Sequence, residues 1–169
     1  SNGIITTVAG TGGQWFSGDG GHATAAELGG NVGIAVGADN CLYLADTNNQ
    51  KIRKVDSRGF ITSIAGAGTP MQQWSTIPVV PGNGGSIGSA QLYLSYGIAV
   101  SADHAIYLTG GGNRIQKIDP DGRIATVAGT GTFDYAGDGG PALSAQLRRS
   151  QGVAVGTGNT FYIADTWNH

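Results

Sequence analysis

The sequence predicts an all-β repeat fold, and three observations support this class. Glycine contributes 31 of the 169 residues, well above the share of about 7% in ordinary proteins, whereas charged residues make up only 12%. Short runs of Val, Ile, Tyr and Thr alternate with Gly, Asp, Asn and Ser, the pattern of strands joined by tight turns. No run keeps a helical period over ten residues, so only residues 23–28 and 142–147 are each expected to form a helical turn.

Besides the glycine content and the short apolar runs, the third observation is an internal repeat, which is clearest in residues 33–66. This stretch reads GIAV, ADN, CLYLADTNNQ, KIRKVD, SRG and FITSIAG, so four apolar runs are separated by turns. Residues 97–129 repeat the same order, and residues 152–169 repeat its first half. The units begin 64 and 55 positions apart, which fits four-stranded propeller blades plus an insertion. The sequence therefore predicts a β-propeller.

Seven segments follow from this repeat. The last strand of a preceding blade is expected at residues 1–10, complete blades at 33–66 and 97–129, and the first half of a further blade at 152–169. The insertions between them carry GDGG in the first and third cases and the weaker PGNGG in the middle one; they span residues 11–32, 67–96 and 130–151. Because the chain starts and stops inside a blade, we expect a segment of a larger ring or of a tandem assembly.

The runs GIAV, LYLADTNNQKIRKVD and ITSIAG resemble NHL repeats, a family of β-propellers, over nearly the whole chain. Residues 46–50 and 165–169 match the region of the Asn-His-Leu type motif, whereas the middle copy carries TGGGN at 109–113 and lacks the acidic residue. The GDGG insertions are similar to those of bacterial NHL-type chains, often secreted or at the cell surface, and of extracellular NHL domains in animal adhesion proteins. The resemblance implies a ring of about six four-stranded blades and an extracellular or cell-surface location.

Aromatic residues gather in or beside the insertions, where loops on a propeller face commonly contact protein or sugar ligands. Each GDGG loop adds one Asp among glycines whose backbone N–H groups could bind an anion. The predicted binding residues are Trp15, Phe16, Asp19, Trp74, Phe133, Tyr135 and Asp138. The alternatives are that the aromatic rings pack between blades and that the GDGG loops are turns.

Polar residues at two strand ends are predicted to stabilise turns rather than to act in catalysis. Asp46 and Asp165 each end a strand and lead into an Asn-rich turn, where a side-chain oxygen accepts backbone N–H bonds. The predicted turn residues are Asp46, Asn48, Asp165 and Asn168. On the following strand, Lys51, Arg53 and Lys54 alternate with apolar residues, so these three are expected to face solvent.

Charge and residue spacing argue against several function classes. A formal charge of −2, with Arg148 and Arg149 as the only adjacent basic pair, predicts no binding of nucleic acid, and no apolar run approaches the ~20 residues of a membrane span. His22, His104 and His169 occupy non-equivalent repeat positions without metal-ligand spacing. Each GDGG loop has a single carboxylate, which is poor for Ca²⁺. No cofactor, metal ligand or catalytic residue is therefore predicted.

The sequence thus predicts a non-catalytic module for extracellular protein or glycan binding, or for structural assembly by strand complementation between copies. Unpaired strand edges at both ends would pair with other copies or with further blades. The alternative is part of a propeller enzyme, of the lyase or lactonase type, whose catalytic residues lie in blades outside this segment.

Overall fold

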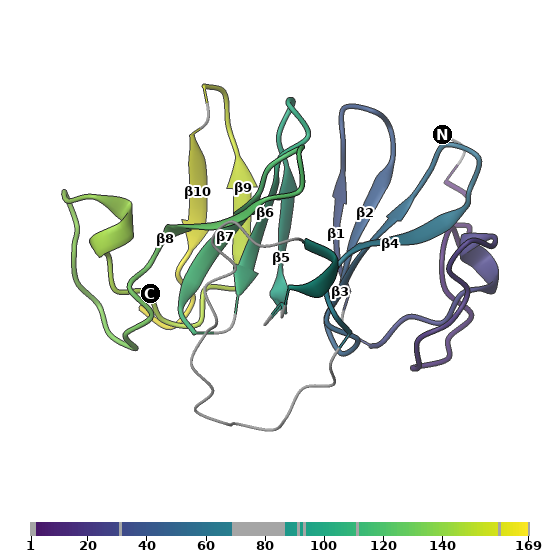
Figure 1. Cartoon of the computed structure of the whole chain (residues 1–169), viewed down its shortest axis with the longest axis horizontal. Coiled ribbons are helices and arrows are strands. Elements are labelled where there is room, and N and C mark those ends of the chain that lie inside the picture. Colours follow the sequence, from purple (N-terminus) through teal and green to yellow (C-terminus); the bar gives the residue numbers. More distant parts are fainter. Residues whose placement is uncertain are drawn as a thin grey trace.

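The fold was derived from a computed structural model, which describes residues 3–30, 32–68, 87–90, 92, 94–110, 112–158 and 160–168. Its strands form three antiparallel sheets that lie side by side like the blades of a fan (Figure 1). Two sheets have four strands and the third has two. We call them the first, second and third blade in chain order.

Strands within each blade follow one another in sequence order. The first blade consists of β1 (Val32–Val36), β2 (Leu42–Asp46), β3 (Lys51–Val55) and β4 (Ile61–Ala65). The second consists of β5 (Leu94–Val100), β6 (Ile106–Gly110), β7 (Arg114–Ile118) and β8 (Ile124–Ala128). The third pairs β9 (Gly152–Val155) with β10 (Phe161–Ala164).

Helical structure in the described residues is limited to three short 3-10 turns, η1 (Ala23–Ala25), η2 (Ile87–Ser89) and η3 (Ala142–Ser144). Two of them lie where single helical turns were predicted, in the GDGG insertions. The predicted fold class is confirmed: the chain is nearly all β and is a segment of a larger propeller.

The first two strands of each complete blade are joined by turns of the same shape. Asn40 follows β1 with a φ of 57°, and His104, at the equivalent place after β5, has a φ of 66°. Asn and His are among the non-glycine residues that tolerate this left-handed conformation best. His104 is therefore a turn residue.

The core of the protein lies between blades, because each sheet buries a face against the next. Tyr43, Ala45 and Ile52 of the first blade pack against Ile98 and Leu108 of the second. A smaller cluster joins the second blade to the third; its buried and half-buried members are Ile115, Val127, Ala128, Ala145, Leu147, Val153, Phe161 and Ile163. Burial between sheets accounts for the apolar, β-branched runs of the repeat.

Neighbouring inner strands approach each other most closely at glycines. A Cβ on Gly33 would collide with the carbonyl oxygen of Tyr96, and a Cβ on Gly97 would lie 2.7 Å from that of Gln151. Only glycine permits such a close backbone approach. This explains why the first run of each repeat begins with glycine.

The two outermost blade surfaces stay exposed, and we call them the end faces. Ile34 on β1 is 63% exposed, whereas its repeat equivalent Ile98 is 7% exposed because the first blade covers it. At the other end, Tyr162 on β10 is 65% exposed, whereas its equivalents Tyr43 and Tyr107 are 4% and 3% exposed. The end faces are thus the surfaces that a neighbouring blade buries elsewhere in this chain.

Residues 3–10 depart from the expectation of a strand. They have no strand assignment, and Ile4, Ile5 and Val8 are exposed. Within the described residues no strand pairs with this segment, and an unpaired strand has nothing to supply its backbone hydrogen bonds.

Candidate functional site

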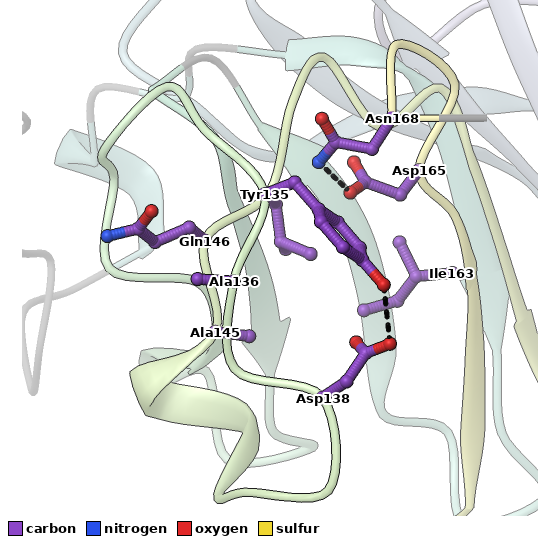
Figure 2. A pocket seen from close by; sticks show the side chains of 9 residues that line it. Tyr135, Ala136, Asp138, Ala145, Gln146, Ile163, Asp165 and Asn168 are labelled. Carbon is purple, nitrogen blue, oxygen red and sulfur yellow. Dashed lines mark hydrogen bonds between the residues drawn. The ribbon is translucent and has the colours of Figure 1, made fainter.

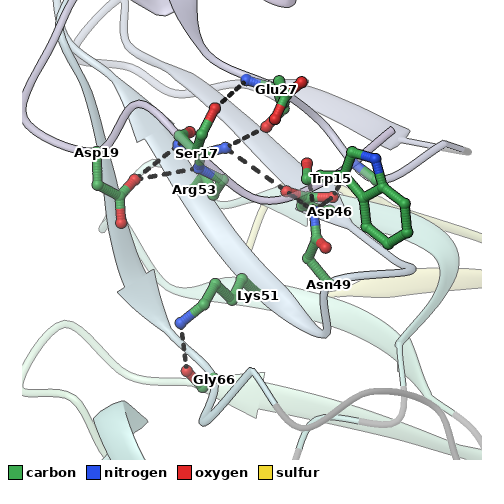
Figure 3. Close-up of polar contacts among 10 residues, drawn as sticks. Trp15, Ser17, Asp19, Glu27, Asp46, Asn49, Lys51, Arg53 and Gly66 are labelled. Atoms are coloured by element: carbon green, nitrogen blue, oxygen red, sulfur yellow. Dashed lines mark hydrogen bonds and ion pairs between the residues drawn. The ribbon is translucent and has the colours of Figure 1, made fainter. Parts of the chain in front are cut away.

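The GDGG insertion of the first blade is held in place by a buried arginine of β3. The Arg53 side chain is 0% exposed, and its Nη2 and Nε donate to Asp19 Oδ1 at 2.8 and 3.2 Å (Figure 3). Nη1 donates to the carbonyl oxygen of Glu27 at 2.8 Å, and Nη2 donates to that of Ser17 at 2.7 Å. One side chain therefore fixes three points of the insertion.

The prediction that Arg53 faces solvent is wrong. Arg53 pairs with Leu44 across β2 and β3, so both side chains lie on the same face of the sheet. The insertion covers that face, where Leu44 packs with Ala23 and Ala26. Strand alternation distinguishes two faces but does not show which one an insertion will cover.

Asp46, at the end of β2, completes this cluster. It is 0% exposed, and its Oδ1 accepts the backbone N–H of Gly29 at 2.7 Å. The side-chain amide of Asn49 donates to both carboxylate oxygens at 3.0 Å, and Nη1 of Arg53 lies 3.7 Å from Oδ2. Asp46 thus ties the turn after β2, the insertion and β3 together, whereas Asn48 in the same turn is exposed.

The second blade lacks both partners of this ion pair. Gly110 occupies the position of Asp46, and Gln116 occupies that of Arg53. There the backbone N–H of Gly97 donates instead to Thr109 Oγ1, at 2.9 Å. The acid and the arginine are therefore present together or replaced together, as expected for one structural unit.

The GDGG insertion of the third blade lines a pocket of about 320 Å³ (Figure 2). We call it the Asp138–Asp165 pocket. Asp165 Oδ1 accepts the backbone N–H of Arg148 at 2.7 Å and the hydroxyl of Ser150 at 2.8 Å, and the Asn168 amide donates to Oδ2 at 2.6 Å. The Tyr135 hydroxyl donates to Asp138 Oδ2 at 2.6 Å, and this hydrogen bond raises the pKa of Tyr135.

The predicted aromatic binding residues lie on the insertions and are exposed wherever the structure describes them. Trp15 is 77% exposed, and the exposed Phe16 ring lies 5.0 Å from the Arg53 guanidinium. Phe133 and Tyr135 are also exposed. Trp74 lies outside the described residues.

A second aromatic cluster includes the predicted Phe133 and forms around the basic pair, a contact that the sequence did not suggest. The guanidinium of Arg148 lies 4.5 Å from the Phe133 ring and 5.8 Å from the Trp167 ring, and that of Arg149 lies 4.6 Å from Trp167. Stacked arginine and aromatic side chains of this kind are enriched at protein interfaces.

Clusters of metal ligands and membrane-spanning helices were sought in the described part of the chain. No three His, Cys, Asp or Glu side chains there gather in a way that could hold a metal ion. His22, one of the candidates considered, stacks on Phe60 with ring centroids 4.5 Å apart. The described residues also contain no helix that is long and apolar enough to cross a membrane.

Comparisons with known proteins agree with this architecture. The model of the teneurin NHL domain matches residues 2–79. Teneurin-m of Drosophila melanogaster is 31% identical over 156 residues, which are 88% of this chain but only 6% of that protein. The chain therefore spans a small part of this relative's length.

Two solved structures from Bacteroides share the fold. A protein of unknown function from Bacteroides thetaiotaomicron superposes with a TM-score of 0.66 at 23% identity, over 85% of this chain and 35% of that one. An auxiliary nutrient binding protein from Bacteroides ovatus gives a TM-score of 0.59 at 18% identity, over 87% of this chain and 37% of that one.

The repeated blades, with their glycine-led inner strands and inter-blade core, define a segment of a β-propeller. Together with the family model that matches residues 2–79, they show that the repeats are of the NHL type, and the chain is similar to teneurins.

Proposed function

We propose that this chain is a non-catalytic module that acts outside the cell in protein or glycan binding and in structural assembly. The observation that carries the proposal is the exposure of the end faces. Ile34 and Tyr162 are exposed, although the equivalent residues of adjoining blades are buried. Apolar faces beside unpaired strand edges favour association with further blades, whether these belong to other copies or to other chains.

The exposed aromatic residues of the insertions support the binding part of the proposal. Trp15, Phe133 and Tyr135 lie on loops, where large rigid rings add contact area at little entropic cost. Trp167 and Phe133 both lie against the Arg148 guanidinium, and Trp167 also lies against that of Arg149. Aromatic and arginine side chains together are typical of the centres of protein interfaces.

The acids of the first blade support a structural role over a catalytic one. Asp46 is buried among hydrogen-bond donors, and Asp19 is ion-paired with Arg53. Both carboxylates are thus engaged by donors that position the insertion, whereas a general acid or base has to exchange its proton with a reacting group. The resemblance of the GDGG insertions to those of secreted chains supports the proposed extracellular location.

The solution mass measured by light scattering after size exclusion, over a range of concentrations, tests the assembly. We expect the mass to exceed that of one chain and to rise with concentration. Tyr162→Lys, which places a charge on one end face, should shift the protein toward the monomer. Thr62→Lys is the matched control, because Thr62 is exposed on β4 away from the end faces. A monomer at every concentration would refute the assembly.

A further inference from the structure

We infer that the Asp138–Asp165 pocket is a guanidinium-binding site, which takes the arginine of a β-strand that pairs with β10. The inference rests on the proposed function and defines the partner strand by its chemistry. The first blade supplies the reference, because there the equivalent position between Asp19 and Asp46 is filled by Arg53.

The two sites have the same acids and glycines at the same spacing. Asp138 follows Asp19 by 119 positions, and Asp165 follows Asp46 by the same number. The glycines around the two insertion acids coincide at that spacing. Ala136 and Gln146 take the places of Ser17 and Glu27, whose carbonyl oxygens accept hydrogen bonds from Arg53. A β-strand arginine at the pocket would meet two carboxylates and the same two backbone carbonyls.

Two of the hydrogen bonds around the strand-end acids also recur. Asp165 Oδ1 accepts the N–H of Arg148 at 2.7 Å, the distance at which Asp46 Oδ1 accepts the N–H of Gly29. The amide of Asn168 donates to the carbonyl oxygen of Asp134 at 3.1 Å, as Asn49 donates to that of Trp15 at 3.3 Å. Asp165 therefore has the orientation that Asp46 has beside Arg53.

The insertion of the third blade keeps its shape without a third strand. Gly137 has a φ of 101°, as Gly18 has 85°, and in both loops the N–H three residues later donates to this glycine's carbonyl at 3.0 Å. The N–H of Gly129 donates to the Ala142 carbonyl at 3.0 Å, as Gly10 donates to Ala23 at 2.9 Å. The backbone of the insertion is therefore pre-organised, which lowers the entropic cost of binding there.

Charge and shape favour a guanidinium on a strand. The residues that line the pocket include two acids and, within the described part of the chain, no Lys or Arg. Figure 2 shows the Tyr135 ring lying between the two carboxylates, and its equivalent Phe16 lies 5.0 Å from the guanidinium of Arg53. A planar cation that bonds two carboxylates and stacks on a ring is the typical role of arginine.

The surface around the pocket indicates that the arginine is carried by a β-strand. Ala26 is buried against Val55 and Ile61 of β3 and β4, whereas its equivalent Ala145 is only half buried. Among the described strands β10 pairs only with β9, so its other edge can accept a further strand. Since Arg53 pairs with Leu44, the arginine of the added strand is expected opposite Ile163.

A labelled peptide with the sequence KIRKVDSRGFITSIAG, taken from residues 51–66, tests the inference with the unmodified chain. Its affinity is measured by fluorescence anisotropy beside that of a second peptide with glutamine in place of its first arginine. A buried hydrogen bond to a charged group contributes about 1.5–3 kcal/mol, so the arginine peptide should bind about 10-fold to 100-fold more tightly.

Two chain variants locate the effect. Asp138→Asn should remove most of the preference for arginine, whereas Asp19→Asn, the matched change in the first blade, should leave it intact because Arg53 already fills that site. Circular dichroism verifies that both variants fold, and the peptide substitution gives an independent result that no folding defect affects.

The outcomes separate the inference from the proposed function. Equal affinities of the two peptides would overturn the guanidinium site and leave strand addition in place. No saturable binding of either peptide would overturn the inference as a whole. Only the additional finding of a concentration-independent monomer would also refute the assembly proposed above.

Discussion

Replacing Arg53 with glutamine, the residue that the second blade has at this position, should destabilise the first blade strongly. The change removes the only cation near Asp46 and Asp19 among the described contacts, and it leaves the carbonyl oxygens of Ser17 and Glu27 without their donors. Asp46 is fully buried, so water cannot replace the lost partner.

The size of the effect follows from burial. Breaking a buried ion pair by removing one partner costs about 3–5 kcal/mol. The lower part of this range applies here, because Asp46 keeps its bonds from Gly29 and Asn49 and because Asp19 is 33% exposed. A loss of about 3 kcal/mol corresponds to a fall in melting temperature of roughly 6–12 °C for a chain of this size.

Urea unfolding followed by circular dichroism measures this loss. Gln116→Met is the matched control in the second blade, and we expect it to change the free energy of unfolding by less than about 1.5 kcal/mol. Asp19→Asn should destabilise the parent chain but have little further effect in the Arg53→Gln background. A loss below about 1 kcal/mol for Arg53→Gln, or strict additivity of the two changes, would refute the reasoning.

Two further predictions concern packing and pH. Gly33→Ala should lower the free energy of unfolding by about 1–3 kcal/mol, since its Cβ would strike the backbone of Tyr96, and by more than Gly152→Ala in the same denaturation assay. The ion pair with Lys54 at 2.7 Å holds the pKa of Asp39 well below its ordinary 3.8. The Lys54 and Asp39 side chains are 30% and 25% exposed, so the pair contributes up to about 1 kcal/mol to the free energy of unfolding. This contribution should be complete above pH 3.8 and disappear as the pH falls toward the lowered pKa. Asp39→Asn should abolish this part of the pH dependence of unfolding.

Much of the fold could be predicted from the sequence because it depends on local signals. Turn residues such as Asn40 and His104, and the glycine that opens each inner strand, recur at fixed places in the repeat. Strand formation at residues 4–9 could not be judged in this way, because pairing depends on neighbours that the local pattern does not contain.

The candidate site was harder to predict because its partners are far apart in sequence. Asp19 and Arg53 are 34 positions apart, and strand alternation alone placed Arg53 in solvent. One signal was available: Gly110 and Gln116 replace Asp46 and Arg53 together in the second copy, a joint change that indicates contact. The cluster of Phe133, Trp167 and the two arginines had no such signal, since it occurs around a basic pair found in one copy only.

The independent shape of the third insertion also bears on how such a chain is made. A ribosome releases the insertion of a blade before the strand that carries the arginine, as Asp19 precedes Arg53. If the loop takes its final form on its own, as residues 137–146 do, the binding site is already folded when the arginine leaves the ribosome. Each blade would then be assembled in the order of synthesis. The strand that carries the arginine would bind to an insertion that has already folded.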